Sequence, residues 1–254
     1  MDRSFLVRLF GYRAAFVHGD CLMLDRWRFV TKHLPKTNNG ERVFDVGCGS
    51  GAFTIGVAKR GYDAVGLSWD TRNQAVATER AAIVKVKNTT FPVGDARYLD
   101  QLQEHVGRYD YVLSLENIEH ILDDRKLFSD LIRCLRPGGW LILSTPNKNY
   151  RAITPDDDGP FPTEETGWHV RRGYTSEMLR ELSRDAGVEV ESIGFCSGFL
   201  SQKLTWIMKR AGFLGWLFIL PLRILPPILD PIIAKLTKYP AFCITLVAYK
   251  PRFS

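Results

Sequence analysis

Short apolar runs alternate with amphipathic stretches through the middle of the chain. Five runs have the length and composition of buried strands, at residues 43–46, 64–67, 89–93, 109–115 and 140–144. Between them, apolar positions recur at helical spacing over residues 54–59, 73–87 and 123–135. Strands that alternate with helices in this way predict an α/β fold, with a parallel sheet that carries helices on both faces.

The apolar positions also predict which side of each helix faces the sheet. In the helix expected over residues 73–87, the inward positions are expected to be Ala75, Val76, Ala82 and Ile83. The helix expected over residues 123–135 is followed by Arg-Pro-Gly-Gly, which cannot continue a helix. The fifth strand is therefore expected to begin at Trp140.

Helical patterns precede and follow this alternation. Residues 5–34 carry apolar residues at helical spacing and end at a Pro-Lys-Thr-Asn-Asn-Gly cluster. Residues 174–186 predict a helix with Thr175 as its N-cap. Residues 188–195 and 242–249 have the pattern of two final strands. The polar stretch between the fifth strand and the last helix, rich in proline and aspartate, is either a solvated loop or a mobile lid.

Residues 199–239, between the final strands, form the most apolar part of the sequence. They contain no uninterrupted run of the roughly 20 apolar residues that a membrane-spanning helix needs. Basic residues flank the apolar pieces: Lys203, Lys209, Arg210, Arg223, Lys235 and Lys238. Apolar, tryptophan-containing helices with a basic margin predict a face that lies on a membrane. A helical cap on the protein's own core, or a dimer contact, is the alternative.

Composition narrows the class of protein. The chain has 254 residues, 45% of them hydrophobic, which is enough for one large domain and leaves little for a second. The net charge of +6 favours anionic partners, namely nucleic acid, membrane lipid or phosphorylated substrates, without choosing among them. The five cysteines are scattered, and no C-x-x-C pair occurs, so they are expected to be reduced thiols. No signal peptide is expected. Together these features predict a cytoplasmic protein, with contact on the inner face of the membrane as an addition.

A glycine-rich turn at residues 43–53 carries the first chemical signal. A buried strand ends in three alternate glycines, Gly47, Gly49 and Gly51, and a helix follows. Asp45 stands two residues before the first glycine, where a carboxylate would repel a pyrophosphate and would suit the cationic amino-acid end of S-adenosylmethionine. A tight turn that binds no ligand is the alternative.

This turn resembles motif I of the class I, Rossmann-like S-adenosylmethionine-dependent methyltransferases. The run Leu-Arg-Pro-Gly-Gly-Trp-Leu-Ile-Leu-Ser-Thr-Pro-Asn is similar to a later motif of the same family, and the resemblance covers about residues 43–144. It implies a doubly wound, mostly parallel seven-stranded sheet with an antiparallel C-terminal edge. A single methyltransferase domain is then expected over residues 1–254. It comprises an N-terminal helical segment (1–40), a Rossmann-like core (41–198 and 240–254) and an apolar helical insertion (199–239).

The resemblance also implies a set of cofactor-binding residues. S-adenosylmethionine is expected to contact the first-strand turn and the ends of the next strands, at Asp45, Gly47, Cys48, Gly49, Gly51, Ala96 and Leu115. The family usually has an acid for the ribose after the second strand, whereas this sequence has Ser68 there and its nearest acid is Asp70. Either Asp70 or Ser68 with a water is expected to hold the ribose. Asp95 is expected to accept from the adenine amino group, or to cap the next helix instead.

Candidate catalytic groups follow the fourth strand. Glu116, Glu119 and His120 would share one face if this segment turns into a helix, and His169 lies beyond the polar loop. The pattern resembles that of ubiquinone-pathway O-methyltransferases and small-RNA 2′-O-methyltransferases, in which such a cluster holds Mg²⁺ or a similar ion. Three alternatives stay open: these four residues bind a metal, His120 acts as a metal-free base supported by Glu119 and His169, or the cluster has no chemical role.

The expected activity is methyl transfer from S-adenosylmethionine to a small, lipid-like or prenylated acceptor, at a hydroxyl. Residues 199–239 motivate the lipid-like acceptor. A catalytically silent Rossmann-like binding module is the alternative, on the ground that Ser68 replaces the usual acid. An RNA 2′-O-methyltransferase ranks lower, because the sequence has no appended RNA-binding module and no aromatic–basic interleaving. The oligomeric state is open.

Overall fold

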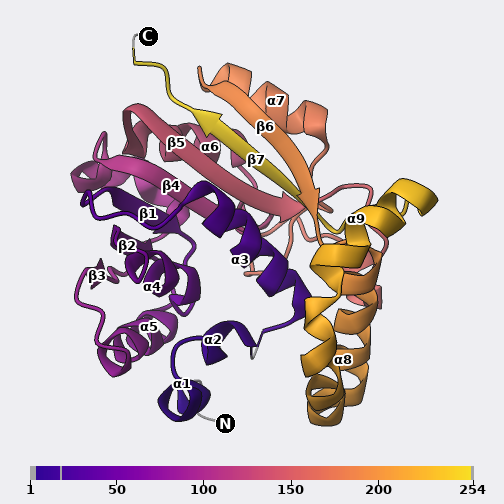
Figure 1. Cartoon of the computed structure of the whole chain (residues 1–254). Coiled ribbons are helices and arrows are strands. Elements are labelled where there is room, and N and C mark those ends of the chain that lie inside the picture. The colour runs from indigo at the N-terminus through magenta and orange to yellow at the C-terminus, as the bar shows by residue number, and fades with distance from the viewer. Residues whose placement is uncertain (1–3, 18, 253–254) are drawn as a thin grey trace.

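A seven-stranded sheet forms the centre of the molecule in the computed structural model, which describes residues 4–17 and 19–252 (Figure 1). The strand order is β3-β2-β1-β4-β5-β7-β6. The strands are β1 (Arg42–Val46), β2 (Asp63–Leu67), β3 (Thr89–Thr90), β4 (Tyr109–Leu115), β5 (Leu135–Pro146), β6 (Glu189–Cys196) and β7 (Cys243–Tyr249). The first five pair in parallel, and β7 is antiparallel to both β5 and β6. The predicted α/β fold with an antiparallel C-terminal edge is confirmed.

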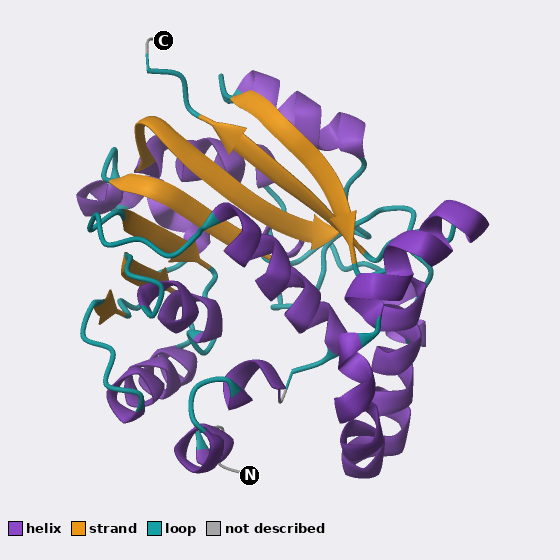
Figure 2. Cartoon of the chain, in the orientation of Figure 1, coloured by secondary structure: helices purple, strands orange, loops and turns teal. Residues whose placement is uncertain are grey.

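Helices cover both faces of this sheet, as predicted. In Figures 1 and 2, α3 (Cys21–His33) crosses in front of the sheet, and α6 (Asp124–Cys134) and α7 (Ser176–Asp185) lie behind it. Successive side chains of β1 point to opposite faces of the sheet, because side chains alternate along a strand. Val43 packs with α3 and α4 (Ala52–Ala58), whereas Phe44 packs with α6. The central strands are therefore buried on both sides, which explains their nearly continuous apolar sequences, whereas the edge strand β6 is largely exposed.

The inward face expected for the helix after β2 is wrong for Ala75 and Ala82, whereas Val76 and Ile83 are partly buried and Ile83 packs against the core. In α5 (Thr71–Ile83), Ala75 and Ala82 are exposed, and the buried residues are Gln74, Ala77, Arg80 and Ala81. Two of them are polar because they bind neighbouring backbone. Gln74 donates to the Gly66 carbonyl at 2.8 Å, and Arg80 donates to the Ser50 carbonyl at 3.2 Å and to the Ser50 hydroxyl at 2.7 Å. These polar bonds, together with the burial of Ala77 and Ala81, set the orientation of the helix.

Two strands also differ in extent from the prediction. Pairing of β3 stops at Thr90 and resumes only as a single bridge between Ser68 and Val93. Pro92 lies in this gap and has no N–H to give to a ladder. In contrast, β5 starts at Leu135, before the expected Trp140, because the chain pairs with β4 as soon as α6 ends.

The N-terminal segment is helical but not continuous. It divides into α1 (Phe5–Phe10), α2 (Ala14–Val17) and α3, and Gly11 ends α1 with a φ of 76°. Residues 1–3 and 18 of the predicted segment lie outside the described residues. At the other end of the core, Thr175 caps α7 as predicted, and its hydroxyl accepts from the Met178 N–H at 3.3 Å.

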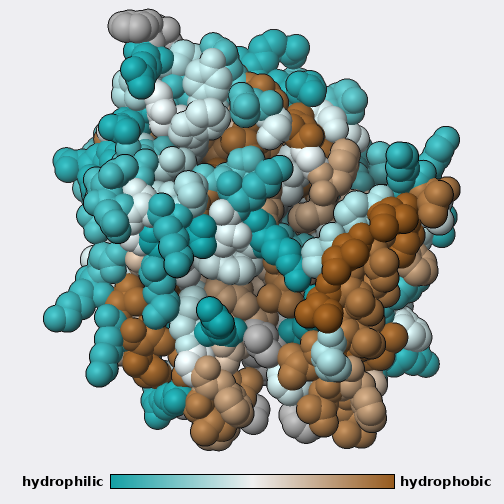
Figure 3. All heavy atoms as spheres, in the orientation of Figure 1, coloured by the Kyte–Doolittle hydropathy of each residue, from teal (hydrophilic) through white to brown (hydrophobic). Residues whose placement is uncertain are grey.

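Residues 199–237 form a pair of helices that extends beside the sheet, and we call this segment the helical arm. It consists of α8 (Phe199–Ile219), η5 (Leu220–Ile224) and α9 (Pro226–Thr237), and α8 is broken at Gly212. Figure 3 shows apolar residues along its outer surface. Across the described residues, no single helix is long and apolar enough to cross a membrane. One bent pair, Leu214–Ile224 with Pro226–Thr237, meets the length and composition criteria together, at an angle of 78°.

Candidate active site

In the glycine turn after β1, one glycine allows close packing of helices and another faces open space. Its three glycines have positive φ values, 84° at Gly47, 52° at Gly49 and 74° at Gly51. A Cβ on Gly51 would lie 2.7 Å from the Ala77 Cβ, so this glycine lets α4 pack against α5. A Cβ on Gly49 would meet nothing within 4 Å. Gly49 therefore lines free volume, and a ligand can lie directly against its backbone.

A cavity of about 390 Å³ opens on one side of this turn. The loops that follow several strands line it, as expected for the carboxyl edge of a parallel sheet. Its lining includes Gly47, Gly49, Ser68, Trp69, Asn73, Asp95, Ala96, Arg97, Asn117, His120 and residues 165–167. The side-chain nitrogen of Asn117 is buried without a hydrogen-bond partner, so this wall offers a donor to a ligand.

A second cavity of about 200 Å³ lies on the other side and shares Gly47 and Gly49 with the first. Its remaining lining combines charged and apolar groups: Met23, Arg26, Asp45, Cys48, Ser50, Ala52, Phe53, Leu115 and Glu116. Two cavities that meet at a glycine turn suit an elongated ligand, with a nucleoside in the larger one and a charged amino-acid group in the smaller one.

Two carboxylates line the smaller cavity, and Asp45 is the one that has no arginine partner in the described contacts. Its side chain is almost fully buried, and Oδ2 accepts from the Thr54 hydroxyl at 2.6 Å. Burial raises the pKa of Asp45 to about 6, and the Thr54 bonds only partly oppose this rise. Keeping this buried carboxylate ionised costs free energy, and a cationic ligand group would offset that cost. This supports the predicted role of Asp45 at the cationic amino-acid end of S-adenosylmethionine.

Arg26 belongs to this cavity and was not predicted from the sequence. Its guanidinium lies 3.0 Å from Glu116 Oε2 and carries a charge that a ligand carboxylate can use. Burial lowers the pKa of Arg26, but the Glu116 carboxylate and other nearby acidic groups, chiefly Cys243 and Asp20, together outweigh it and raise the pKa. One arginine in an amphipathic helix gives no sequence signal; only the way α3 crosses the sheet brings it to the site.

The structure at the end of β2 distinguishes in part between Ser68 and Asp70, the two residues predicted as partners of the ribose. Ser68 lines the larger cavity, whereas Asp70 caps α5 and accepts from the Arg72 N–H at 2.8 Å. The position between them holds Trp69, whose ring is 66% exposed and lines the same cavity. Of the two, Ser68 is the better placed, and an indole face beside it was not predicted.

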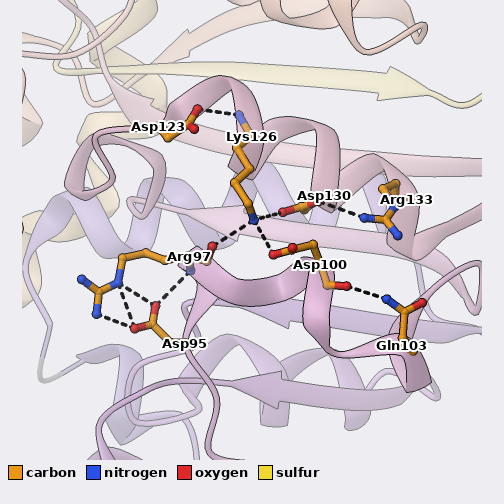
Figure 4. Close-up of polar contacts among 8 residues, drawn as sticks. All are labelled: Asp95, Arg97, Asp100, Gln103, Asp123, Lys126, Asp130 and Arg133. Atoms are coloured by element: carbon orange, nitrogen blue, oxygen red, sulfur yellow. Dashed lines mark hydrogen bonds and ion pairs between the residues drawn. The ribbon is translucent and has the colours of Figure 1, made fainter.

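Asp95 lines the cavity and also caps the following helix, so both of its predicted roles are compatible with its position. It accepts from the Arg97 N–H at 2.9 Å, and the Arg97 side chain binds both of its oxygens (Figure 4). Arg97 also pairs with Glu165 at 3.0 Å, which fastens the loop over the cavity. Burial raises the pKa of Asp95, but the bonds from Arg97 outweigh it and lower the pKa.

The short helix that carries Arg97 is itself held in place. Lys126 of α6 donates to the Arg97 carbonyl at 3.0 Å and pairs with Asp130 at 2.7 Å and with Asp100 (Figure 4). The network joins η1 (Ala96–Gln101) to α6. The acid at the end of β3 is therefore positioned by the sheet-covering helix behind it.

Three of the predicted catalytic residues meet at one point. Glu119 Oε1 lies 3.9 Å from His120 Nε2 and 3.8 Å from His169 Nε2. These distances are too long for hydrogen bonds. Oε2 of the fully buried Glu119 accepts from the Thr145 hydroxyl at 3.0 Å, and Oε1 has no hydrogen-bond partner. The unsatisfied oxygen faces both imidazoles, so the cluster can accept a proton or a cation.

Burial sets the charge of this cluster. It raises the pKa of Glu119, with the Glu116 carboxylate adding to the effect, and it lowers the pKa of His120. Burial and then the neighbouring His120 lower the pKa of His169 to about 4. Both imidazoles are neutral near pH 7, which leaves a ring nitrogen free to accept a proton or bind a metal.

The prediction that Glu116 belongs to this cluster is wrong. The segment forms only a short turn of 3₁₀ helix, η3 (Ile118–His120), and Glu116 precedes it with a φ of 51°. Its carboxylate turns to the smaller cavity, where it binds Arg26 and accepts from the Ser144 hydroxyl at 3.0 Å. The helical spacing of 116, 119 and 120 therefore does not bring their side chains to one face.

Similarity to known proteins decides the family. The sequence model of the family described as "Methyltransferase domain" matches residues 18–215. The chain belongs to this family. The predicted class, S-adenosylmethionine-dependent methyltransferase, is confirmed, and the alternative of a catalytically silent module is set aside.

Named relatives and a solved structure agree with this assignment. The methyltransferase is 31% identical to "Ubiquinone biosynthesis O-methyltransferase" of Marinobacter nauticus, over 67% of its own length and 71% of the relative's. It is 30% identical to the protein of that name from Thiobacillus denitrificans, over 72% and 78%. Some other relatives with this name are covered over only 44–47% of their length. An S-adenosylmethionine-dependent methyltransferase structure from Mesorhizobium loti superposes with a TM-score of 0.58 at 19% identity, covering 92% of this chain and all of the other.

The metal site stays a prediction for this methyltransferase, with a reduced ligand set. The donor atoms of Glu119, His120 and His169 lie within 4.8 Å of one another. One carboxylate and two neutral imidazoles are suitable ligands for a first-row divalent metal, and Mg²⁺ usually prefers more oxygen atoms. The unpartnered Oε1 fits a cation, so these three residues are those that would hold one.

Proposed function

We propose that this methyltransferase transfers a methyl group to a hydroxyl of a small, lipid-like or prenylated acceptor, within a single catalytic domain. The observation that carries the proposal is the position of His120, which lines the larger cavity and also belongs to the buried cluster with Glu119 and His169. A basic group at the wall of a cofactor cavity is what the removal of a hydroxyl proton requires. Relatives named for O-methylation in ubiquinone biosynthesis support the same reaction.

The chain's own residues fit S-adenosylmethionine. Asp45 and Arg26 would hold the ammonium and carboxylate of its amino-acid end, and Ser68 and Asp95 would hold the ribose and the adenine. When bound, the cofactor supplies a methyl group on a sulfonium, which a nucleophile displaces in line. The open face at Gly49 leaves room for the link between the two ends. Binding in these two cavities would hold the cofactor in a fixed position and exclude water around it.

His120 would act on the acceptor. Its neutral imidazole would accept the hydroxyl proton as the new bond forms, and the nearby Glu119 carboxylate would stabilise the positive charge that the ring then carries. The second alternative is a divalent metal on Glu119, His120 and His169, which would lower the pKa of the acceptor hydroxyl. The unpartnered Oε1 of Glu119 supports this alternative.

The test of cofactor use compares two glycines. Gly49→Ala and Gly40→Ala impose a similar backbone strain, because both glycines have positive φ and a Cβ on either meets nothing within 4 Å. Only Gly49 lines the cavities. Calorimetric titration should show S-adenosylmethionine and S-adenosylhomocysteine binding to the wild type and Gly40→Ala, and much weaker binding to Gly49→Ala. Equal affinities in both variants would contradict the assigned site.

The test of the reaction uses a catechol with a short prenyl tail and its tail-free analogue, with methylated product measured by mass spectrometry. We expect the prenylated catechol to be the better acceptor and His120→Ala to reduce kcat by roughly 10²–10⁴-fold. A chelator followed by Mg²⁺, Mn²⁺ or Zn²⁺ separates the two alternatives, since only the metal-assisted one loses and regains activity. Activity of His120→Ala equal to the wild type, with or without metal, would refute the role of this cluster.

We propose a cytoplasmic enzyme with peripheral contact to the inner face of the membrane. The apolar helical arm and its basic margin motivate this location.

A further inference from the structure

The helical arm exposes an unusually apolar surface. Among the side chains that the structure describes between residues 206 and 236, eleven large apolar ones are at least 37% exposed: Trp206, Ile207, Leu214, Leu217, Phe218, Leu222, Ile224, Ile228, Leu229, Ile232 and Leu236. Figure 3 shows this surface as a continuous brown area along α9 and the lower part of α8. Isolated exposed apolar residues are normal, but a contiguous patch of this kind marks an interaction surface.

The arm's own packing does not use this surface. Its inner side contacts α3, where Leu204 and Ile219 are buried with Cys21. The acid of the arm is satisfied from within: Asp230 accepts from the Leu200 N–H at 2.6 Å and from the Ser201 N–H at 3.1 Å. The outer apolar face is therefore available to another partner, and the alternative of a cap on the protein's own core applies only to the inner side.

Charge identifies the partner. Residues 199–239 contain six Lys or Arg and a single acid, Asp230, which gives a net charge of +5 out of +6 for the whole chain. Asp230 is buried, whereas five of the basic residues are exposed: Lys203, Lys209, Arg210, Lys235 and Lys238. Two copies of so basic a surface would repel each other. An anionic bilayer attracts the charges and receives the apolar side chains at the same time.

We propose that the helical arm is a membrane-docking surface that inserts its outer apolar side chains into the headgroup region of an anionic bilayer. The basic residues contact the lipid phosphates, and Trp206 has the amphipathic ring that is favoured at such an interface. The arm lies on the surface rather than across the bilayer, since the break at Gly212 and the turn before α9 interrupt any straight helix.

Docking through the helical arm would bring the bilayer close to the candidate active site. The arm is tied to α3 by Asp25, which accepts from the Ser201 hydroxyl at 2.6 Å. The next residue of α3 is Arg26, which reaches the smaller cavity and Glu116. A lipid-like acceptor could thus enter from the bilayer without crossing bulk water, and this last step rests on the function proposed above.

The test is co-sedimentation of the full chain with vesicles of phosphatidylcholine alone or with one third phosphatidylglycerol. We expect binding to the anionic vesicles, weaker binding at high salt, and little binding to phosphatidylcholine. Phe218→Asp combined with Ile228→Asp should abolish it, while Phe218→Leu keeps an apolar side chain and should bind as the wild type. Lys209→Glu with Lys235→Glu should weaken binding at least about tenfold, since each basic charge near an anionic surface contributes about fivefold.

A matched control carries the same charge change elsewhere. Lys36 and Lys87 are exposed and lie outside the arm, so Lys36→Glu with Lys87→Glu should weaken binding much less than the arm variant. The affinity for S-adenosylhomocysteine, unchanged in every variant, reports that the fold is intact. Wild-type protein that stays unbound on anionic vesicles would overturn the proposal. So would equal losses in both lysine pairs, or light scattering that shows a dimer abolished by Phe218→Asp. Vesicle binding needs no methyl transfer, so its failure is distinct from failure of the proposed reaction.

Discussion

Replacing Asp45 by Asn should make the cofactor-free protein more stable at neutral pH and weaken its hold on the cofactor. Burial raises the pKa of this carboxyl from 3.8 to about 6. A pKa that rises by one pH unit on folding corresponds to about 1.4 kcal/mol, so ionised Asp45 costs the folded state about 3 kcal/mol. Asn keeps the shape and can still accept from Thr54, but it has no charge to bury.

The pH dependence of the stability difference tests whether ionised Asp45 destabilises the folded state. A carboxyl whose pKa is raised on folding contributes its stability below the unfolded value and loses it as the pH rises through the folded value. The difference in the free energy of unfolding between Asp45→Asn and the wild type should therefore be near its minimum at pH 4. It should grow between pH 4 and 6 and stay constant above about pH 7. Urea titrations at several pH values measure this difference, and other titrating groups largely cancel in it.

The same pair of proteins tests the role of the carboxylate. Saturating S-adenosylmethionine should stabilise the wild type more than Asp45→Asn, because only the wild type gains an ion pair with the ligand's ammonium group. Two results would refute the reasoning: an Asn variant less stable than the wild type at pH 8, or a stability difference that does not change between pH 4 and 6. In either case Asp45 would already be satisfied by its protein neighbours in the absence of ligand.

Three further changes follow from the site. Arg26→Gln should weaken S-adenosylmethionine binding more than binding of the decarboxylated cofactor, because the lost partner is the ligand carboxylate; equal losses, measured by calorimetry, would place Arg26 elsewhere. Glu165→Gln should speed proteolytic cleavage within residues 148–167, since the ion pair to Arg97 fastens this loop, whereas Glu164→Gln next to it should not. Ser68→Asp restores the acid that the family usually has at the end of β2 and should strengthen binding of S-adenosylhomocysteine about tenfold. The reason is that a hydrogen bond to a charged group contributes about 1.5–3 kcal/mol.

The sequence predicts those parts of the fold that depend on neighbours along the chain. The strand and glycine turn at residues 43–53 follow from a local pattern, as does Thr175 at the start of α7. The inward face of α5 does not, because Gln74 and Arg80 are buried to bind the backbone carbonyls of Gly66 and Ser50. Apolar periodicity has no information about such bonds.

The site divides in the same way. Residues at the ends of successive strands, such as Ser68 and Asp95, were predictable because parallel strands end at one edge of the sheet. His169 was found only through a resemblance, and Arg26 was missed, because α3 precedes the sheet and crosses it at an angle that the sequence does not encode locally. Glu116 was misplaced because its spacing implies a shared face only in an α-helix, whereas the chain forms a short 3₁₀ turn there.

The bridge from Arg97 to both Asp95 and Glu165 makes cofactor exchange sensitive to the solution around it. The Arg97 side chain is 40% exposed, so dissolved ions screen its attraction for the loop carboxylate. Asp95 is the carboxylate proposed to bind the adenine, and Arg97 shares it. We therefore expect the nucleoside to dissociate sooner, and spent cofactor to be replaced faster, as ionic strength rises.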